Sequence, residues 1–265
     1  MKKKVLVIAK TEPSPSKKHG ATVCTAGITD KGEFIRLYPM PFRLFCDDTT
    51  GFNKYDWIEV DCEQSDNDTR SESYKVDEDS IRCVGHIGTD YNWSKRNRII
   101  LPRCSKNFKE LEEKGASLGL IKPSDLLSFE KNMKADGPIA EPSSNYRKVL
   151  QMIFDKEGSL KKIPHIESLD RYYRYGFRCD GEETIHKVMC EDWELYQSSR
   201  SWLDRYKTEE ETWNKIHETY YRYFKEECNL HFFVGTHYLW NTWIIIGLYY
   251  PPNLLAKGQQ MLIMG

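Results

Sequence analysis

The first third of the chain alternates between apolar and polar residues over short stretches, a pattern that indicates β-strands. The strand-like segments are 5–9, 22–28, 33–38, 55–62 and, less clearly, 80–87. The second and third of these flank a Thr-Asp-Lys-Gly turn at 29–32, so they predict a hairpin. Four or five short strands joined by polar loops predict a small barrel or a curled sheet.

The rest of the chain mixes helical and strand-like patterns. Apolar residues three or four positions apart and capping residues before them predict helices. The predicted helices begin near Phe108 and, after Pro123, near Ser124, and cover 192–206 and 209–227. The predicted strands are 172–178, 231–235 and 240–250.

These patterns predict an α+β protein. Its N-terminal half, 1–134, is expected to form a small β-barrel-like unit that binds nucleic acid. Its C-terminal half, 145–265, is expected to pack helices on a mainly antiparallel sheet and to carry the catalytic candidates. A stretch rich in Gly, Pro and Ser at 135–144 predicts the linker, although strands that pair back across it would give one compact domain.

Composition narrows the class of protein. The 265 residues include 39 basic and 40 acidic ones, so the net charge is −1. This balance excludes a uniformly basic nucleic-acid binder but allows a local basic face. No apolar run reaches the roughly 18 residues of a membrane span. The eight dispersed cysteines predict reduced thiols in the cytoplasm rather than a disulfide framework.

Aromatic and cationic residues alternate most clearly at 34–43, where they suit a phosphate backbone beside an unstacked base. In the alternative interpretation, Arg36 pairs with a carboxylate of the acidic stretch that follows. Similar residues occur in the loop at 11–20, in the DTRSESY segment and in the C-terminal half. The candidate nucleic-acid-binding residues are Lys17, Lys18, Arg36, Tyr38, Phe42, Arg43, Arg70, Trp193 and Trp240.

Two carboxylates beside a tryptophan are the main catalytic candidates. Asp192 and Glu194 flank Trp193, an apolar neighbour that can desolvate a carboxylate and change its pKa. His186 is the third candidate, since it lies within reach if the chain turns. The alternative for Asp192 is a helix N-cap, with Glu194 in the first turn.

Zinc-ligand side chains occur in the same region. Cys179, His186 and Cys190 offer thiolate and imidazole ligands, and His186 and Cys190 have a one-turn helical spacing. No fourth ligand follows at a regular spacing. The sequence therefore favours a protein without a metal, and no other cofactor is expected.

The chain resembles a largely uncharacterised family of bacterial proteins in the segments VCTAG…FIRLYPMPFR, DTRSESY, YGFRC…H…DWE and FFVGT…WIIIGLYYPP. These segments are spread over nearly the whole chain, but they do not name a reaction. A more distant similarity is to an anti-phage DNA glycosylase that removes glucosylated bases. That similarity implies hydrolysis of the N-glycosidic bond of a modified base.

Three functions follow from these residues. The first is an enzyme acting on a modified base in DNA, in which a carboxylate stabilises the sugar cation while rings enclose the extruded base. The second is a non-catalytic reader that uses the same rings and cations. The third is a structural subunit of a larger complex, whose aromatic surface contacts protein. DNA is the expected partner in the first two.

Overall fold

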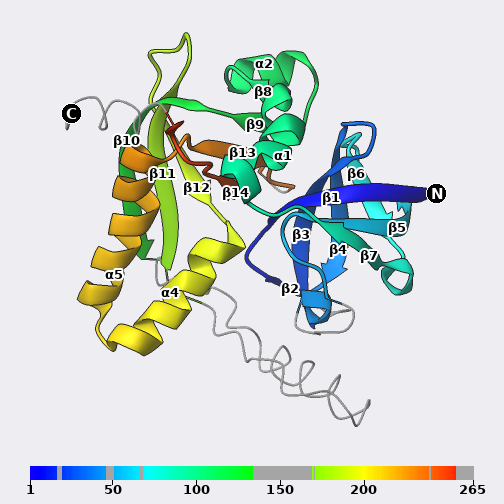
Figure 1. Ribbon diagram of the computed structural model, residues 1–265, viewed down its shortest axis with the longest axis horizontal. Coiled ribbons are helices and arrows are strands. Elements are labelled where there is room, and N and C mark those ends of the chain that lie inside the picture. Colours follow the sequence, from blue (N-terminus) through cyan, green and yellow to red (C-terminus); the bar gives the residue numbers. More distant parts are fainter. Residues whose placement is uncertain are drawn as a thin grey trace. The chain divides into compact units, whose positions relative to one another are not determined.

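The computed structural model describes residues 1–16, 20–45, 51–65, 68–133, 169, 171–238 and 240–254. Its contacts divide the chain into two compact units, each of which is described by itself (Figure 1). One unit holds Met1–His86 together with Asn132–Tyr172. The other holds Ile87–Lys131 together with Tyr173–Gly265.

The described part of the first unit is built almost entirely of strands. They are β1 (Lys2–Lys10), β2 (Ser14–Ser16), β3 (Gly20–Thr29), β4 (Phe34–Pro41), β5 (Asp56–Gln64), β6 (Ser73–Val76) and β7 (Arg82–His86), with short 3-10 helices at Phe42–Phe45 and Glu78–Ser80. The order β1-β3-β4-β6-β5 closes on itself because β5 also pairs with β1, and only the β4–β6 pairing in this ring is parallel. We call this ring of five strands the first barrel.

Alternation along these strands fills the first barrel. The expected hairpin forms, since β3 pairs with β4 around the turn at 29–32, where Gly32 adopts a φ of 87°. The side chains inside include Val5, Leu37, Ile58 and Val60, each fully buried. The barrel that the short alternations predict is therefore confirmed.

The second unit has more elements. Its strands are β8 (Cys104–Ser105), β9 (Leu118–Ile121), β10 (Pro123–Met133), β11 (Arg171–Cys179), β12 (His186–Cys190), β13 (His231–Thr236) and β14 (Trp243–Tyr249). Its helices are α1 (Asp90–Ile100), α2 (Phe108–Glu113), α4 (Trp193–Tyr206), α5 (Glu209–His217) and α6 (Phe224–Glu227), with a 3-10 turn at Leu101–Arg103 and a π-helical turn at Glu218–Tyr223.

The sheet of the second unit begins at β10 and comes back to β9, the strand directly before β10 in the sequence. Its order is β10-β11-β12-β14-β13-β9-β8, and only Lys122 separates β9 from β10. The two can therefore be treated as halves of one bent strand, which pairs with β13 at one end and with β11 at the other. We call this ring the second barrel.

Both barrels share one strand order. If the bent strand counts once, the fifth strand of each barrel lies between the third and the fourth, and the fourth pairs with the first. The fifth is parallel to the third in both, as β6 is to β4 and β14 is to β12. This is the strand order of the OB-fold, a five-stranded Greek-key barrel.

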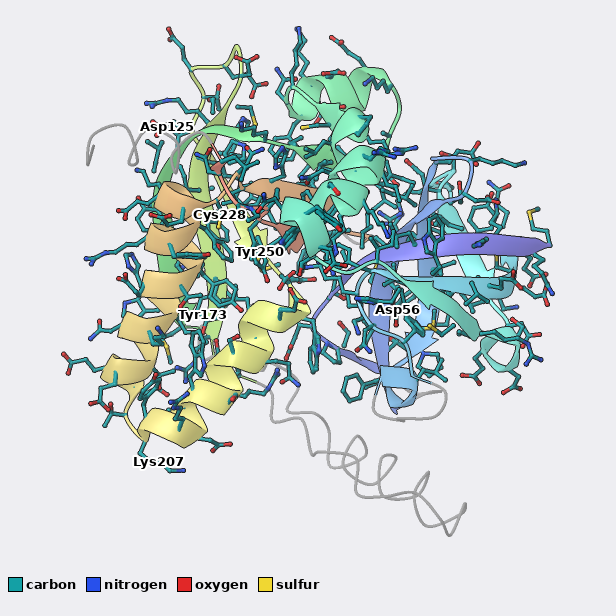
Figure 2. All side chains as sticks on the ribbon, viewed as in Figure 1. Asp56, Asp125, Tyr173, Lys207, Cys228 and Tyr250 are labelled. Atoms are coloured by element: carbon teal, nitrogen blue, oxygen red, sulfur yellow. The ribbon has the colours of Figure 1, made fainter. Side chains whose placement is uncertain are left out.

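Helices α4 and α5 lie along one side of the second barrel (Figure 1), and an aromatic layer joins them to it. Tyr173, which is labelled in Figure 2, lies between the ribbon of β11 and the helices. Its hydroxyl lies 2.6 Å from Ser199 Oγ of α4, and Tyr175 donates to the carbonyl of Tyr220 at 2.7 Å. Phe129 of β10, Tyr173 and Trp213 of α5 form a cluster of three nearly parallel rings with centroids 5.6–6.4 Å apart. Tyrosine hydroxyls that reach hydrogen-bond partners can be buried at little cost, which explains how so aromatic a chain forms a core.

The α+β class is confirmed, with an N-terminal barrel and a C-terminal sheet that carries helices. The helix expected near Ser124 is wrong, because that segment is β10, which pairs with β11. The units also divide differently from the expected halves, since Ile87–Lys131 belongs to the second. Pairing between strands that are distant in sequence determines both the secondary structure near Ser124 and the boundary between the units. The local spacing of apolar residues does not reveal such pairing. Among the described residues, no helix is long and apolar enough to cross a membrane.

Candidate nucleic-acid interface

The predicted cation of the first barrel lies inside a hydrogen-bonded network. Arg36 on β4 is 3% exposed, and its Nη1 donates to Ser73 Oγ of β6 at 3.0 Å. Burial lowers the pKa of the guanidinium, while the Cys24 thiol acts in the opposite direction. The DTRSESY segment follows β5; the charge of its Arg70 lowers the pKa of Arg36 further, while the charges of Asp68 and Glu72 raise it.

The second cation of this barrel is held by a carboxylate. Arg70 donates from Nε to Asp68 Oδ1 at 2.7 Å and from Nη2 to Asp68 Oδ2 at 2.5 Å, a bidentate pair. Burial alone would raise the pKa of Asp68, but hydrogen bonds from Arg70 and Ser73 and the Arg70 charge outweigh it and lower that pKa to about 2. The Arg70 side chain is only 17% exposed.

The remaining candidates of the first unit have mixed positions. Tyr38 is 46% exposed, and its hydroxyl accepts from Thr22 Oγ1 at 3.5 Å, whereas Phe42 is buried. Lys17 and Lys18 and the side chain of Arg43 lie outside the described residues. Among the described candidates of this unit, Tyr38 is the one that lies on the surface.

The second barrel presents cations on its second and third strands. Alternation places Arg174 and Arg178 on one face of β11, and Lys187 of β12 shares that face because it pairs with Gly176 between them. The side chain of Arg178 is 38% exposed and that of Lys187 is 60% exposed. Both form ion pairs: Arg178 Nη1 lies 3.3 Å from Asp125 Oδ2, and Lys187 Nζ lies 3.2 Å from Glu130 Oε1.

This cationic face has a flat centre. Gly176 carries no side chain, and a Cβ there would lie 2.3 Å from Ser128 Oγ and so would displace this hydroxyl. The ion pairs of Arg178 and Lys187 lie at the surface on either side of this glycine. Such exposed ion pairs contribute little to stability, so phosphate can take the place of the Asp125 and Glu130 carboxylates.

An aromatic loop joins the fourth and fifth strands of the second barrel. Tyr238 and Trp240 are 64% and 65% exposed, and the rings of His237 and Trp240 stack at 4.1 Å and 14°. Backbone bonds from His237 N to Thr242 O and from Asn241 N to His237 O close this loop tightly. Trp240, a candidate nucleic-acid-binding residue from the sequence, therefore presents its ring at the surface.

The loop begins at the same end of the barrel as β12. Trp243 is the first residue of β14, and His186 is the first residue of β12. The Phe108 ring lies between them, with its centroid 5.4 Å from that of Trp243 and 5.0 Å from that of His186. Trp243 Nε1 also donates to Glu112 Oε1 at 3.0 Å and so anchors the base of the loop. In OB-folds, the ligand crosses the second and third strands and reaches the loop between strands four and five.

Asp192 occupies the capping position that was its alternative role. Its Oδ1 accepts from Leu195 N at 3.1 Å, which caps α4, and its Oδ2 accepts from Leu248 N of β14 at 3.0 Å. The residue is 1% exposed. Both carboxylate oxygens therefore bind backbone N–H groups, and the residue ties α4 to the barrel.

The other catalytic candidates do not converge on Asp192. Glu194 is partly exposed in the first turn of α4, and Trp193 lies beneath the Arg200 guanidinium at 5.6 Å. His186 and Asp192 stand at opposite ends of β12, roughly 15–20 Å apart along an extended chain. The chain does not turn between them, as the grouping of His186 with Asp192 requires.

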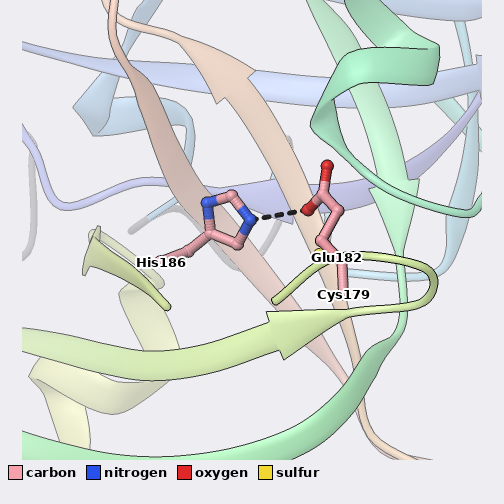
Figure 3. Close-up of side chains that lie close together, drawn as sticks. All are labelled: Cys179, Glu182 and His186. Atoms are coloured by element: carbon pink, nitrogen blue, oxygen red, sulfur yellow. Dashed lines mark hydrogen bonds and ion pairs between the residues drawn. The ribbon is translucent and has the colours of Figure 1, made fainter. Parts of the chain in front are cut away.

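His186 belongs to a different group of polar side chains. Its Nε2 lies 2.7 Å from Glu182 Oε2, and Cys179 completes a set whose ligand atoms all lie within 4.8 Å of one another (Figure 3). Burial, followed by the charges of Glu182 and Cys104, raises the pKa of the Cys179 thiol to about 12. Cys190 lies at the far end of β12 and is not in this set.

The sequence patterns did not predict several of the residues described above. Arg174, Arg178 and Lys187 were not named as binding residues, although alternation in YYRYGFRC already places both arginines on one strand face. Tyr238 escaped because the apolar pattern predicts a strand that begins at 240. Glu182 escaped because the metal-ligand pattern considers only cysteines and histidines.

Comparison with protein families assigns the chain in two parts. A domain of unknown function, DUF8758, matches residues 1–102, and a second, DUF8757, matches residues 104–263, more than half of the chain. The chain belongs to the DUF8757 family. The boundary between the two matches lies after α1, whereas the structure places α1 in the second unit. No curated protein sequence matches the chain.

Proposed function

We propose that this protein binds DNA with unstacked bases through the second barrel. The observation that carries the proposal is the combination of a cationic β11–β12 face with the exposed rings of Tyr238 and Trp240. Cations follow a phosphate backbone while bases stack on rings, which is how single strands are bound without strict sequence preference. The strand order supports the same surface by analogy.

Binding accounts for more of the geometry than base removal does. A glycosylase needs a carboxylate beside the extruded base, but both oxygens of Asp192 accept backbone hydrogen bonds at a buried helix cap. We therefore favour a non-catalytic reader of a modified base. A DNA glycosylase in anti-phage defence is the second candidate, and the phage-DNA assay described below distinguishes the two. We expect the complex in the cytoplasm, where thiols remain reduced.

The test is binding of the whole chain to a labelled single-stranded oligonucleotide. Trp240→Ala and Tyr238→Ala should each weaken binding about tenfold, since stacking on a ring contributes about 1–3 kcal/mol per base. The matched control is Tyr91→Ala, which removes a ring that is 86% exposed on α1 of the same unit. Equal effects of the control and the loop variants would refute the proposed surface.

The same preparation should be incubated with unmodified and heavily modified phage DNA. Preferential binding without release of a base supports the reader. Release of a base that persists in Asp192→Asn would show an enzyme that uses another carboxylate, with Glu194 the first to replace. Release that is lost in a folded Asp192→Asn variant would restore Asp192 as the catalytic group.

A further inference from the structure

The hairpin between β11 and β12 collects three side chains that differ in chemistry but share metal-binding capacity. Cys179 is the last residue of β11, His186 is the first of β12, and Glu182 lies in the turn between them. A thiol, an imidazole and a carboxylate are the three protein ligand types of zinc. Their ligand atoms all lie within 4.8 Å of one another.

The backbone fixes this arrangement. Gly181 adopts a φ of 73°, which reverses the chain, and Glu182 N donates to the carbonyl of Cys179 at 3.2 Å. The turn therefore folds the Glu182 side chain back over Cys179, towards His186 (Figure 3). Two of the three side chains sit on paired strands, since Phe177 pairs with His186. A site held by strands keeps its geometry better than one held by a loop.

The surroundings orient the imidazole and leave one side open. Phe108 packs its ring edge-on against His186 with centroids 5.0 Å apart, and Phe177 lies 5.7 Å away. Cys179 is 1% exposed, whereas the side chains of Glu182 and His186 are 19% and 20% exposed. A buried sulfur and two partly exposed ligands describe a site with an apolar floor and an entry from solvent.

We propose that Cys179, Glu182 and His186 bind one zinc ion, with water in the fourth position. Zinc–sulfur and zinc–nitrogen bonds of about 2.3 and 2.0 Å place tetrahedral ligand atoms about 3.5 Å apart. The three atoms need to move by roughly 1 Å or less to reach that spacing. The Glu182–His186 contact then changes from a hydrogen bond to two bonds with a common ion.

Binding of the ion is a proton exchange without a redox step. Zinc replaces the proton of the Cys179 thiol, which leaves to the solvent, and the imidazole proton of His186 moves from Nε2 to Nδ1 so that Nε2 can bind the ion. The ion joins the end of β11 to the start of β12. It thereby fixes the hairpin beside Trp243, the residue at which the aromatic loop rejoins the barrel.

The experiment uses the whole chain, stripped with a chelator and titrated with Zn²⁺ and, as a spectroscopic probe, with Co²⁺. We expect one equivalent to bind, with a thiolate-to-cobalt charge-transfer band and the intense d–d bands of tetrahedral Co²⁺. Cys179→Ser should abolish the charge-transfer band. Glu182→Gln, a substitution in a surface turn that leaves the fold intact, should weaken zinc binding at least tenfold.

The controls are Glu183→Gln, which replaces the neighbouring exposed carboxylate, and Cys83→Ser, which replaces an exposed thiol of β7. Both should bind the ion as the unchanged protein does. The proposal is overturned if no stoichiometric binding occurs, or if folded Cys179→Ser and Glu182→Gln variants bind zinc with unchanged affinity. Octahedral cobalt spectra without the charge-transfer band would equally contradict the thiolate ligand.

Discussion

The two barrels of this protein share a strand order but differ in the exposure of the cations on their candidate binding faces. In the first barrel, Arg36 is 3% exposed and Arg70 is held by a bidentate carboxylate. In the second barrel, Lys187 is 60% exposed in a weak surface ion pair, on the face that it shares with Arg178. Strand order alone therefore does not make a binding face; the positions of the charged side chains decide it.

The connection between the third and fourth strands differs as well. In the first barrel, residues 42–55 connect these two strands. In the second barrel, the connection contains the helices α4, α5 and α6. Asp192 fixes the start of this helical insertion to β14, and the aromatic layer covers the sheet. The second unit thus gains a large buried core of its own, which lets its opposite face carry exposed cations.

Acid should affect the two barrels in different pH windows. Burial, and then the Lys122 charge, lower the pKa of His231 to about 4, from an ordinary value near 6.5. Neutral His231 therefore contributes stability that is complete above pH 6.5 and is lost as the pH falls to 4, by up to about 3 kcal/mol. Asp68 contributes stability that is complete above pH 3.8 and is lost only as the pH falls towards 2.

Denaturant unfolding followed between about pH 7 and pH 4 checks this difference. A His231→Asn variant should show a flatter dependence of the free energy of unfolding on pH over that window. An unchanged slope in the variant would mean that another group of the chain titrates there.

Asp192→Asn should destabilise the second unit by about 2 kcal/mol. From the sequence alone, the substitution is expected to change stability little, because asparagine also caps helices. The structure adds the bond from Leu248 N to the second oxygen, and an amide cannot accept through both of its side-chain atoms. One buried N–H then has no partner or faces an amide donor. Equal unfolding free energies for variant and parent would contradict this.

Trp240→Ala should weaken binding of single-stranded DNA about tenfold, because one base loses its stacking partner. Tyr38→Ala, the corresponding change at the exposed ring of the first barrel, should have little effect. Fluorescence anisotropy at fixed salt measures both. The reverse ranking would move the interface to the first barrel.

Removing the cations of the β11–β12 face should reduce the salt dependence of binding. For a single strand, each phosphate that the protein no longer neutralises reduces the slope of log K against log salt by about 0.7. Lys187→Gln and Arg178→Gln should each show this decrease, whereas Arg222→Gln, an exposed arginine of the π-helical turn, should not. A slope that stays constant in the first two variants would exclude them from the interface.

Local pattern was enough where neighbours in sequence decide the structure. The hairpin of β3 and β4 follows from its turn residues, and α4 follows from the capping residue Asp192 and the spacing after it. The pattern failed at β10, because only pairing with β11 and stacking of Phe129 on Tyr173 make that segment a strand.

The site was harder to predict for the same reason. Arg36 and Lys187 look alike in sequence, as cations within strands. Their environments depend on what the neighbouring strand supplies: Ser73 and the Asp68–Arg70 pair beside Arg36, and the side-chain-free Gly176 beside Lys187. Likewise, Glu182 joins His186 only because the turn at Gly181 brings them together.

Hydrogen exchange of the whole chain, with and without a saturating single-stranded oligonucleotide, distinguishes the two barrels as the binding surface. Binding to the second barrel should slow exchange in β11, in β12 and in the loop at 237–242, and leave it unchanged in β3, β4 and the segment at 68–76. Protection confined to β3, β4 and 68–76 would contradict binding to the second barrel and assign the nucleic acid to the first barrel.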